Sequence, residues 1–435
     1  MNLITLESQF TWQLHGIAGH HALTGGQFVT RDGIWRALAP SERVHAAKEA
    51  YIGYTVHTTG RLDLAALATA YAAVSRAYPQ LAARLVASDH GPVFAEADAP
   101  AKIHTCDGDL ARPLTGVELD QHRALSALNV VRDGDDATVC LLTHHSIADA
   151  HHSIEVLVAL WSCYTDAVQG APVDLPRHPY PRSLEDLLAE RGIRSAAPGA
   201  EPAPQPLAQP NQPVVTARNT PDQHVIQHRL TAAQTSALVE LGHRENVTIN
   251  GLLAGVLLLV EAEIRDLPLT ELVYRFTVNL RSHLTPPVGP TEGTNVLGGA
   301  GFTAAGDLKP DAVALGRAIG ERLREGLADG SIQRSLLDLL SQARPGAKPW
   351  DPSTAPAVVS MMNWGAVPPM RTPHDLRLTN FHSAPSIRET TAMGGYVVNT
   401  FDGRIGIDLT WPEGDPELPA RLDSLRDRLS RLTLQ

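Results

Sequence analysis

Apolar residues recur at helical spacing in several segments of the chain. In the first, Asp63 is a suitable N-cap and Pro79 ends a run with apolar positions at Leu64, Leu67, Tyr71 and Val74. A second helix is expected to follow residue 149 and to stop at Gly170. The same spacing predicts a largely buried helix over 248–265, capped by Thr248, and further helices over 311–327 and 419–432.

Short apolar runs between these helices predict strands. One such run is "DDATVCLLTHH", residues 135–145, which leads directly into the helix that follows residue 149. Others are 271–284, whose end carries Asn279 and Arg281, and 355–365. The segment 396–411 contains Asp402-Gly403, a strong hairpin signal. Strands and helices alternate in both halves of the chain, which indicates a mixed α/β (α+β) fold.

The clearest interruption of this pattern is a proline-rich segment over 198–221, which holds seven prolines. A chain of 435 residues exceeds what one hydrophobic core usually serves. We therefore expect an N-terminal domain over 1–197, a linker over 198–221 and a C-terminal domain over 222–435.

Composition narrows the class of protein. The contents of 43% hydrophobic and 19% charged residues are those of a soluble globular protein, and the net charge of −11 argues against nucleic acid as a partner. The first ten residues do not form a signal peptide, and the longest apolar stretch, Leu252–Val260, is too short for a transmembrane segment. Cys106, Cys140 and Cys163 form no CxxC pair, so neither a zinc ribbon nor a disulfide framework is expected. The sequence predicts a monomeric, cytoplasmic protein.

Residues 141–157, "LLTHHSIADAHHSIEVL", hold four histidines and one aspartate at the predicted junction of strand and helix. They are interpreted in three ways: as solvated polar residues with Asp149 as a helix cap, as metal ligands, or as an acid/base centre. Metal binding is disfavoured because adjacent His144 and His145 point to opposite faces of an extended strand, and the spacing fits no HExxH motif. The same alternation turns one histidine toward a cavity and the other into packing. His151 and His152 are expected to be surface or capping residues.

His144 to Asp149, "HHSIAD", resembles the HHxxxDG motif of the condensation-domain and polyketide-associated acyltransferase superfamily. Residues 278–298, "VNLRSHLTPPVGPTEGTNVLG", resemble its second motif, and the resemblance extends from about Arg61 to the C-terminus. Two positions depart from the motifs: Ala150 replaces the glycine, and Asn279 replaces the usual aspartate. The resemblance implies two chloramphenicol-acetyltransferase-like subdomains, each a mixed sheet covered by helices, with an active-site tunnel between them.

The resemblance also implies a reaction. An acyl thioester, on a carrier protein, a polyketide synthase carrier domain or coenzyme A, donates its acyl group to a hydroxyl of a hydrophobic alcohol or diol. His145 is the expected catalytic base, without an acyl-enzyme, a cofactor or a metal; the phosphopantetheine or coenzyme A thioester is a substrate. His144, Asp149, Arg281 and Asn279 are expected to support the site. Asp149 either pairs with Arg281 across the two halves or only caps its own helix.

Three further residues are candidates with ordinary structural alternatives. Asn363 and Trp364 end a predicted strand and are candidates to line the tunnel. Arg371, between prolines in "PPMRTP", is the candidate for docking a carrier protein. Three alternative functions stay open at this point: a non-catalytic condensation-like protein that binds carriers, a condensation-type N-acyltransferase, and a metallohydrolase.

Overall fold

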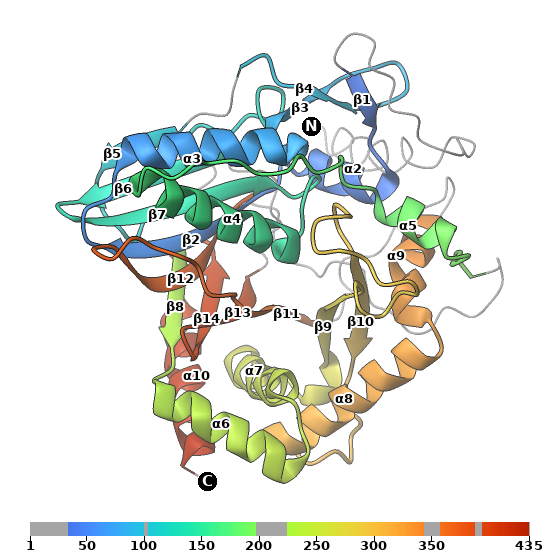
Figure 1. Ribbon diagram of the computed structural model, residues 1–435. Coiled ribbons are helices and arrows are strands. Elements are labelled where there is room, and N and C mark those ends of the chain that lie inside the picture. Colours follow the sequence, from blue (N-terminus) through green and yellow to red (C-terminus); the bar gives the residue numbers. More distant parts are fainter. Residues whose placement is uncertain (1–33, 100–102, 197–223, 343–356, 388–393, 435) are drawn as a thin grey trace, which may run out of the picture.

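Two sheets, each covered by helices, form two lobes in the computed structural model, which describes residues 34–99, 103–196, 224–342, 357–387 and 394–434 (Figure 1). The sheet of the first lobe has the strand order β12-β2-β7-β6-β5. Its strands are β2 (Tyr51–Thr59), β5 (Ile103–Asp107), β6 (Ser126–Asp133), β7 (Asp136–His144) and β12 (Arg377–Ser386). Helices α3 (Leu64–Ala77) and α4 (Ala150–Val168) lie side by side on one face of this sheet (Figure 1).

A small antiparallel sheet, two short α-helices and one 3₁₀ helix complete the N-terminal half. The sheet has the order β1-β4-β3. The elements are β1 (Ile34–Ala37), α2 (Pro40–Ala47), the 3₁₀ helix η1 (Pro79–Ala82), β3 (Ala83–Val86), β4 (Val93–Glu96) and α5 (Leu184–Glu190).

The sheet of the second lobe has the order β10-β9-β11-β13-β14-β8. Its strands are β8 (His224–Arg229), β9 (Leu272–Asn279), β10 (Leu297–Phe302), β11 (Ala357–Ala366), β13 (Gly395–Phe401) and β14 (Arg404–Trp411). The helices are α6 (Ala232–Glu245), α7 (Ile249–Arg265), η2 (Leu269–Glu271), α8 (Ala312–Ala328), α9 (Ser331–Gln342) and α10 (Leu418–Thr433).

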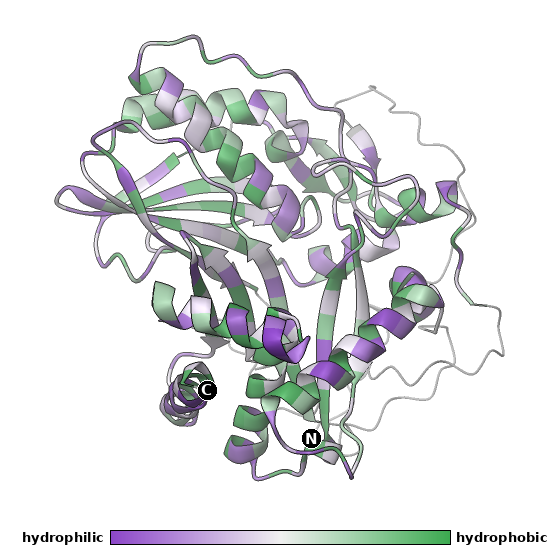
Figure 2. Cartoon of the chain, turned by 60° about the horizontal axis from the view of Figure 1, so that its bottom comes forward, coloured by the Kyte–Doolittle hydropathy of each residue, from purple (hydrophilic) through white to green (hydrophobic). Residues whose placement is uncertain are grey.

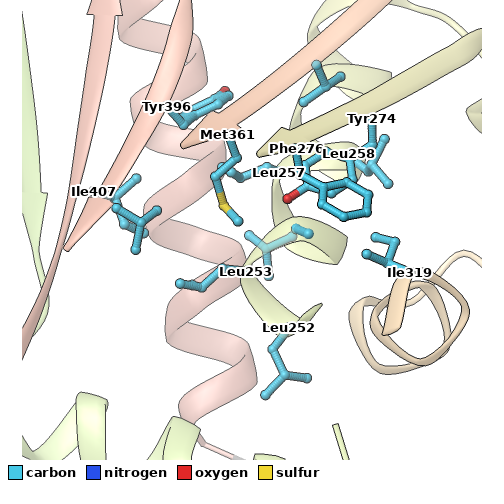
Figure 3. Close-up of a cluster of buried hydrophobic side chains, with 14 of the residues drawn as sticks. Leu252, Leu253, Leu257, Leu258, Tyr274, Phe276, Ile319, Met361, Tyr396 and Ile407 are labelled. Carbon is cyan, nitrogen blue, oxygen red and sulfur yellow. The ribbon is translucent and has the colours of Figure 1, made fainter. Parts of the chain in front are cut away.

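The core of the second lobe forms around α7, which presents leucines to its neighbours on several sides. Leu253 and Leu257 lie among Met361 of β11 and Ile407 of β14, while Leu258 lies near Tyr274 (Figure 3). These side chains are at most 1% exposed, so the helix stabilises the lobe by removing apolar surface from water on most of its circumference. Outer helices carry hydrophilic and hydrophobic residues on different faces, whereas the central strands of the first lobe are largely hydrophobic (Figure 2).

Local signals in the sequence set the ends of several helices. The side chains of Asp63, Asp149, Thr248 and Asp311 each accept a hydrogen bond from a backbone N–H of the helix that follows. The hairpin between β13 and β14 turns at Asp402-Gly403, where both residues have positive φ. The helices and strands predicted around these positions are confirmed.

The two lobes do not follow the predicted halves of the chain throughout. Strand β12 comes from the C-terminal half but pairs with β2 at the edge of the first lobe's sheet. In the other direction, Leu187 and Leu188 of α5 are fully buried in the core of the second lobe. These segments correct the assignment of 222–435 wholly to one lobe and of 1–197 wholly to the other. The predicted linker lies within 197–223, outside the described residues.

No single helix among the described residues is long and apolar enough to cross a membrane. The pair α6 and α7 passes that test together, by length and composition only, with a bend of 103° between the two helices.

Candidate active site

The HHxxxD motif forms the turn between β7 and α4. His144 is the last residue of β7 and is fully buried, with its ring edge-on to Tyr51 at 4.8 Å between centroids. Its Nδ1 accepts from the Ser146 amide at 3.2 Å, so the Ser146 hydroxyl, at 2.7 Å, donates to the same nitrogen. Burial lowers the pKa of His144 to about 3. This histidine is held neutral and takes part in packing.

His145 is half-buried, and the backbone fixes it from both sides. Its N–H donates to the Ala50 carbonyl at 2.7 Å, and its own carbonyl accepts from Asn295 Nδ2 at 2.7 Å. The ring stacks on that of His45, with centroids 4.1 Å apart and planes inclined by 10°. Burial lowers the pKa of His145, against the opposing effects of Asp149 and Asn295. The ring is therefore neutral near pH 7 and able to accept a proton.

Asp149 is fully buried, and its carboxylate accepts hydrogen bonds both from its own helix and from the C-terminal half of the chain. Its carboxylate accepts from Arg281 at 2.8 and 3.0 Å, and from the backbone N–H of His152 at 3.0 Å and of Val296 at 2.9 Å. Burial alone raises its pKa, but Arg281 and these hydrogen bonds outweigh burial and hold it below the usual value. The helix cap and the pairing with Arg281, considered as alternatives from sequence, are both present.

A loop over residues 293–296 binds the motif turn along its length. The Gly293 carbonyl accepts from His152 Nδ1 at 3.0 Å, and the Thr294 carbonyl accepts from the Asp149 amide at 2.7 Å. Asn295 and Val296 add the bonds to His145 and Asp149 described above. The glycine-asparagine of the second motif lies in this stretch, but its hydrogen bonds were not predicted.

His152 corrects a prediction, because it is neither a surface nor merely a capping residue. It is fully buried, and its Nδ1 donates to the Gly293 carbonyl, so its Nε2 accepts from the Gln80 amide at 2.7 Å. Burial lowers its pKa to about 4. His151 is half-buried and lines a cavity.

The two departures from the motifs are accommodated locally. Ala150 is the first residue of α4, where helical backbone accepts an ordinary side chain. The Asn279 side-chain oxygen accepts from the Arg281 amide at 3.1 Å and from its guanidinium at 3.3 Å. Asn279 thus orients Arg281 toward Asp149 without adding a charge.

A cavity of about 320 Å³ opens between the lobes beside Arg281. Its walls come from α4, the segment after β9 and the end of β11, where Trp364 lines it and packs against Tyr54. Neither His145 nor Asn363 is among its lining residues. Asn363 instead donates to Asn250 of α7 at 3.0 Å. The cavity therefore includes one of the two predicted tunnel residues.

Arg371 lies beside the far end of α4. Its guanidinium pairs with Asp166 at 2.7 Å, and its carbonyl accepts from Thr165 at 3.0 Å. Asp166 is 16 residues along α4 from Ala150, about 24 Å at helical rise. Arg371 does not line the cavity at Arg281, and its charge is partly neutralised.

Within the described ranges, no cluster of three or more His, Cys, Asp or Glu residues could hold a metal ion. The site thus consists of a neutral histidine at a lobe junction, a buried ion pair between the lobes and an adjoining cavity. Such an arrangement suits proton transfer during an acyl transfer that needs no protein nucleophile.

Comparison with known proteins agrees with this class. Residues 220–410 match the family described as phthiocerol/phthiodiolone dimycocerosyl transferase C-terminus. The phthiocerol/phthiodiolone dimycocerosyl transferase of Mycobacterium ulcerans is 32% identical over 410 residues, 91% of this chain and 95% of that protein. The structure of polyketide synthase associated protein 5 from Mycobacterium tuberculosis is 28% identical with a TM-score of 0.75, covering 92% of this chain and 98% of that one.

The fold extends to more distant proteins. The first condensation domain of the CDA synthetase has a TM-score of 0.66 at 13% identity, covering 92% of this chain and 97% of that one. Fold and site thus define an acyltransferase with the fold of a condensation domain. The chain belongs to the phthiocerol/phthiodiolone dimycocerosyl transferase family. The predicted family, two-lobed fold and acyltransferase class are confirmed.

Proposed function

We propose that this protein transfers an acyl group from a thioester, on a carrier protein or on coenzyme A, to a hydroxyl of a lipid acceptor. His145 supplies the observation that carries the proposal: a half-buried, neutral imidazole is held by its backbone at the junction of the lobes. The named relatives support a lipid acceptor, since they are dimycocerosyl transferases acting on phthiocerol or phthiodiolone.

In this reaction His145 removes the hydroxyl proton as the acceptor oxygen attacks the thioester carbonyl. The tetrahedral intermediate collapses by breaking the carbon–sulfur bond, and His145 returns the proton to the departing thiolate. The products are an ester and a free thiol, so no cofactor or external base is required. General base catalysis of this kind contributes about 10²–10⁴-fold, and positioning supplies much of the rest.

The test is a matrix of acyl thioesters and acceptors, read by mass spectrometry. Wild-type protein should form esters with long-chain alcohols or diols, and His145→Ala should lose all but a few per cent of the rate while its circular dichroism stays unchanged. A parallel set of reactions with amine acceptors distinguishes ester formation from amide formation. Binding of acyl carriers without turnover on any pair would favour a carrier-binding protein, and amide as the main product would favour the N-acyltransferase.

We also propose that Arg371 contacts an acidic carrier protein when that protein brings the acyl donor. The 56% exposure of its side chain supports an accessible charge, although Asp166 shares it. Arg371→Glu should then raise the KM for a carrier-bound donor and leave acyl-CoA donors nearly unchanged. Arg324→Glu on α8, also an exposed and paired arginine, is the control. An equal response of both donors to Arg371→Glu would contradict this role.

The monomeric state and cytoplasmic location remain predictions.

A further inference from the structure

We propose that His45 on α2 is a positioning residue for the general base: its ring fixes the orientation of His145 and stabilises the imidazolium that His145 forms. The inference rests on the proposed function, because it assigns a partner to the residue that carries that function. Neither motif of the family contains His45, and no pattern in the sequence predicts its contact with His145.

The geometry joins the two histidines through both rings and backbone. The rings are nearly parallel, at 10°, with centroids 4.1 Å apart. The Ala50 amide donates to the His45 carbonyl at 3.2 Å, and the Ala50 carbonyl accepts from the His145 amide at 2.7 Å. One residue therefore links the backbones of both histidines, and rotation of the His145 ring is limited by a flat surface that is itself fixed.

Helix α2 is anchored to the loop that holds His145. One turn before His45, fully buried Glu42 accepts from Arg36 at 2.6 and 2.7 Å and from the Thr294 hydroxyl at 2.8 Å. The next residue of that loop, Asn295, donates to the His145 carbonyl. Two consecutive residues, Thr294 and Asn295, therefore connect α2 to the turn that carries His145. This connection keeps the distance between the two stacked rings constant.

Electrostatics favours one protonation pattern for this pair. Burial, and then the neighbouring His145 and His144, lower the pKa of His45 well below its usual value. The other charged groups near the pair are Lys48, which disfavours a second cation, and Asp149, which is paired with Arg281. His45 therefore stays neutral when His145 takes the hydroxyl proton, and its π face lies against the new cation.

Substitutions separate this role from simple filling of space. His45→Phe keeps a neutral aromatic face, whereas His45→Leu keeps apolar bulk without it. We expect His45→Phe to retain most of the activity and His45→Leu to lower kcat about tenfold with little change in KM, the size typical of a desolvated cation–π contact. The acidic limb of the kcat/KM profile should move to lower pH in His45→Leu, because the His145 imidazolium loses the π face while apolar bulk keeps water out.

The control is His57→Ala, which removes one ring of another histidine pair, His57 on β2 and His382 on β12, whose centroids lie 5.0 Å apart. His57 pairs with Thr138 of β7, six residues before His144, so it lies away from the motif turn. This variant should match wild type in kcat and in the pH profile. Equal rates for His45→Phe and His45→Leu, or a wild-type pH profile for His45→Leu, would overturn the proposal.

A readout without turnover keeps this inference separate from the proposed function. The pKa of His145 is followed by NMR of ¹³C-labelled histidine in wild type, His45→Phe and His45→Leu. It should fall in His45→Leu and stay near the wild-type value in His45→Phe; an unchanged His145 pKa in His45→Leu overturns the inference even if transfer is active. A wild-type protein that forms no ester refutes the proposed function, whatever the titration shows.

Discussion

Asp149 combines two tasks in one carboxylate. It caps α4 through the His152 amide and binds Arg281, which comes from the other half of the chain, so one residue couples the start of a helix to the junction of the lobes. A buried ion pair is poor evidence of net stability, but removal of one partner leaves the other charged and desolvated.

We therefore predict that Asp149→Ala and Arg281→Ala each lower the free energy of unfolding by about 3–5 kcal/mol and abolish activity. Urea unfolding of both single variants and the double variant gives their coupling, expected to deviate from additivity by about 0.5–3 kcal/mol. Glu261 and Arg421, a buried pair within the second lobe at 2.9 Å, form the matched cycle that should leave the His145 turn intact. Strict additivity at Asp149 and Arg281 would remove the bridge between the lobes.

The depressed pKa of His145 sets the pH dependence expected of the reaction. The base must be neutral in the free enzyme, and burial moves its protonation to below pH 6.5. The acidic limb of the kcat/KM profile should then have its midpoint below pH 6.5, as measured with a donor that does not itself titrate there. An acidic limb above pH 6.5 would contradict a desolvated general base.

At the scale of elements, the loop over 293–296 positions the catalytic turn. It spans the distance between α2 and α4 with hydrogen bonds to His152, Asp149 and His145, and in Figure 1 α4 lies beside the yellow segment that follows β9. Because this loop forms several hydrogen bonds with one turn, a shift of the loop also moves the turn. The side chains of the loop therefore affect catalysis without contacting a substrate.

Asn295→Ala should lower kcat about tenfold, because the His145 carbonyl loses its donor and the turn gains freedom. The free energy of unfolding should fall by about 1–2 kcal/mol, as for other lost buried hydrogen bonds. Asn129→Ala is the matched control: its amide donates to the Pro113 and Thr115 carbonyls at 2.7 and 3.0 Å, in a loop of the first lobe. That control should lose similar stability and keep its kcat; equal losses of kcat would show a general effect of unfolding.

Across the whole molecule, several histidines are buried in the neutral state. Burial lowers the pKa of His144 to about 3 and those of His57 and His152 to about 4. In the unfolded chain each titrates near 6.5, so below that pH the unfolded state binds more protons and is favoured. Asp408, whose pKa burial raises to about 6, acts in the opposite direction and offsets about one histidine.

The free energy of unfolding should therefore fall as the pH decreases from about 6.5 to 4. Each neutral histidine contributes a slope of about 1.4 kcal/mol per pH unit in that range. His152→Gln keeps a donor and an acceptor without a titrating group, so its slope should be smaller by about that amount. Urea unfolding at pH 7, 6 and 5 measures both slopes, and identical slopes would show that His152 is not buried and neutral.

What the sequence determined by itself was local. Helices with a cap at Asp63, Asp149, Thr248 or Asp311 formed where the apolar spacing predicted them, because an N-cap acts within three residues. The HHxxxD turn and Arg281 were found for a related reason, since their residues lie in short motifs. Even the pairing of Asp149 with Arg281 became predictable once two separate motifs had been found.

Tertiary structure decided whatever depends on contacts between distant segments. Alternation showed that His144 and His145 face opposite ways, but Tyr51, His45 and Asn295 determine which ring is packed and which is held for catalysis. The burial of His152 could not be predicted from the local sequence, because its hydrogen-bond partners lie 72 and 141 residues away. Strand β12 joined the other lobe since the free edge of β2 offered backbone hydrogen bonds that no local pattern records.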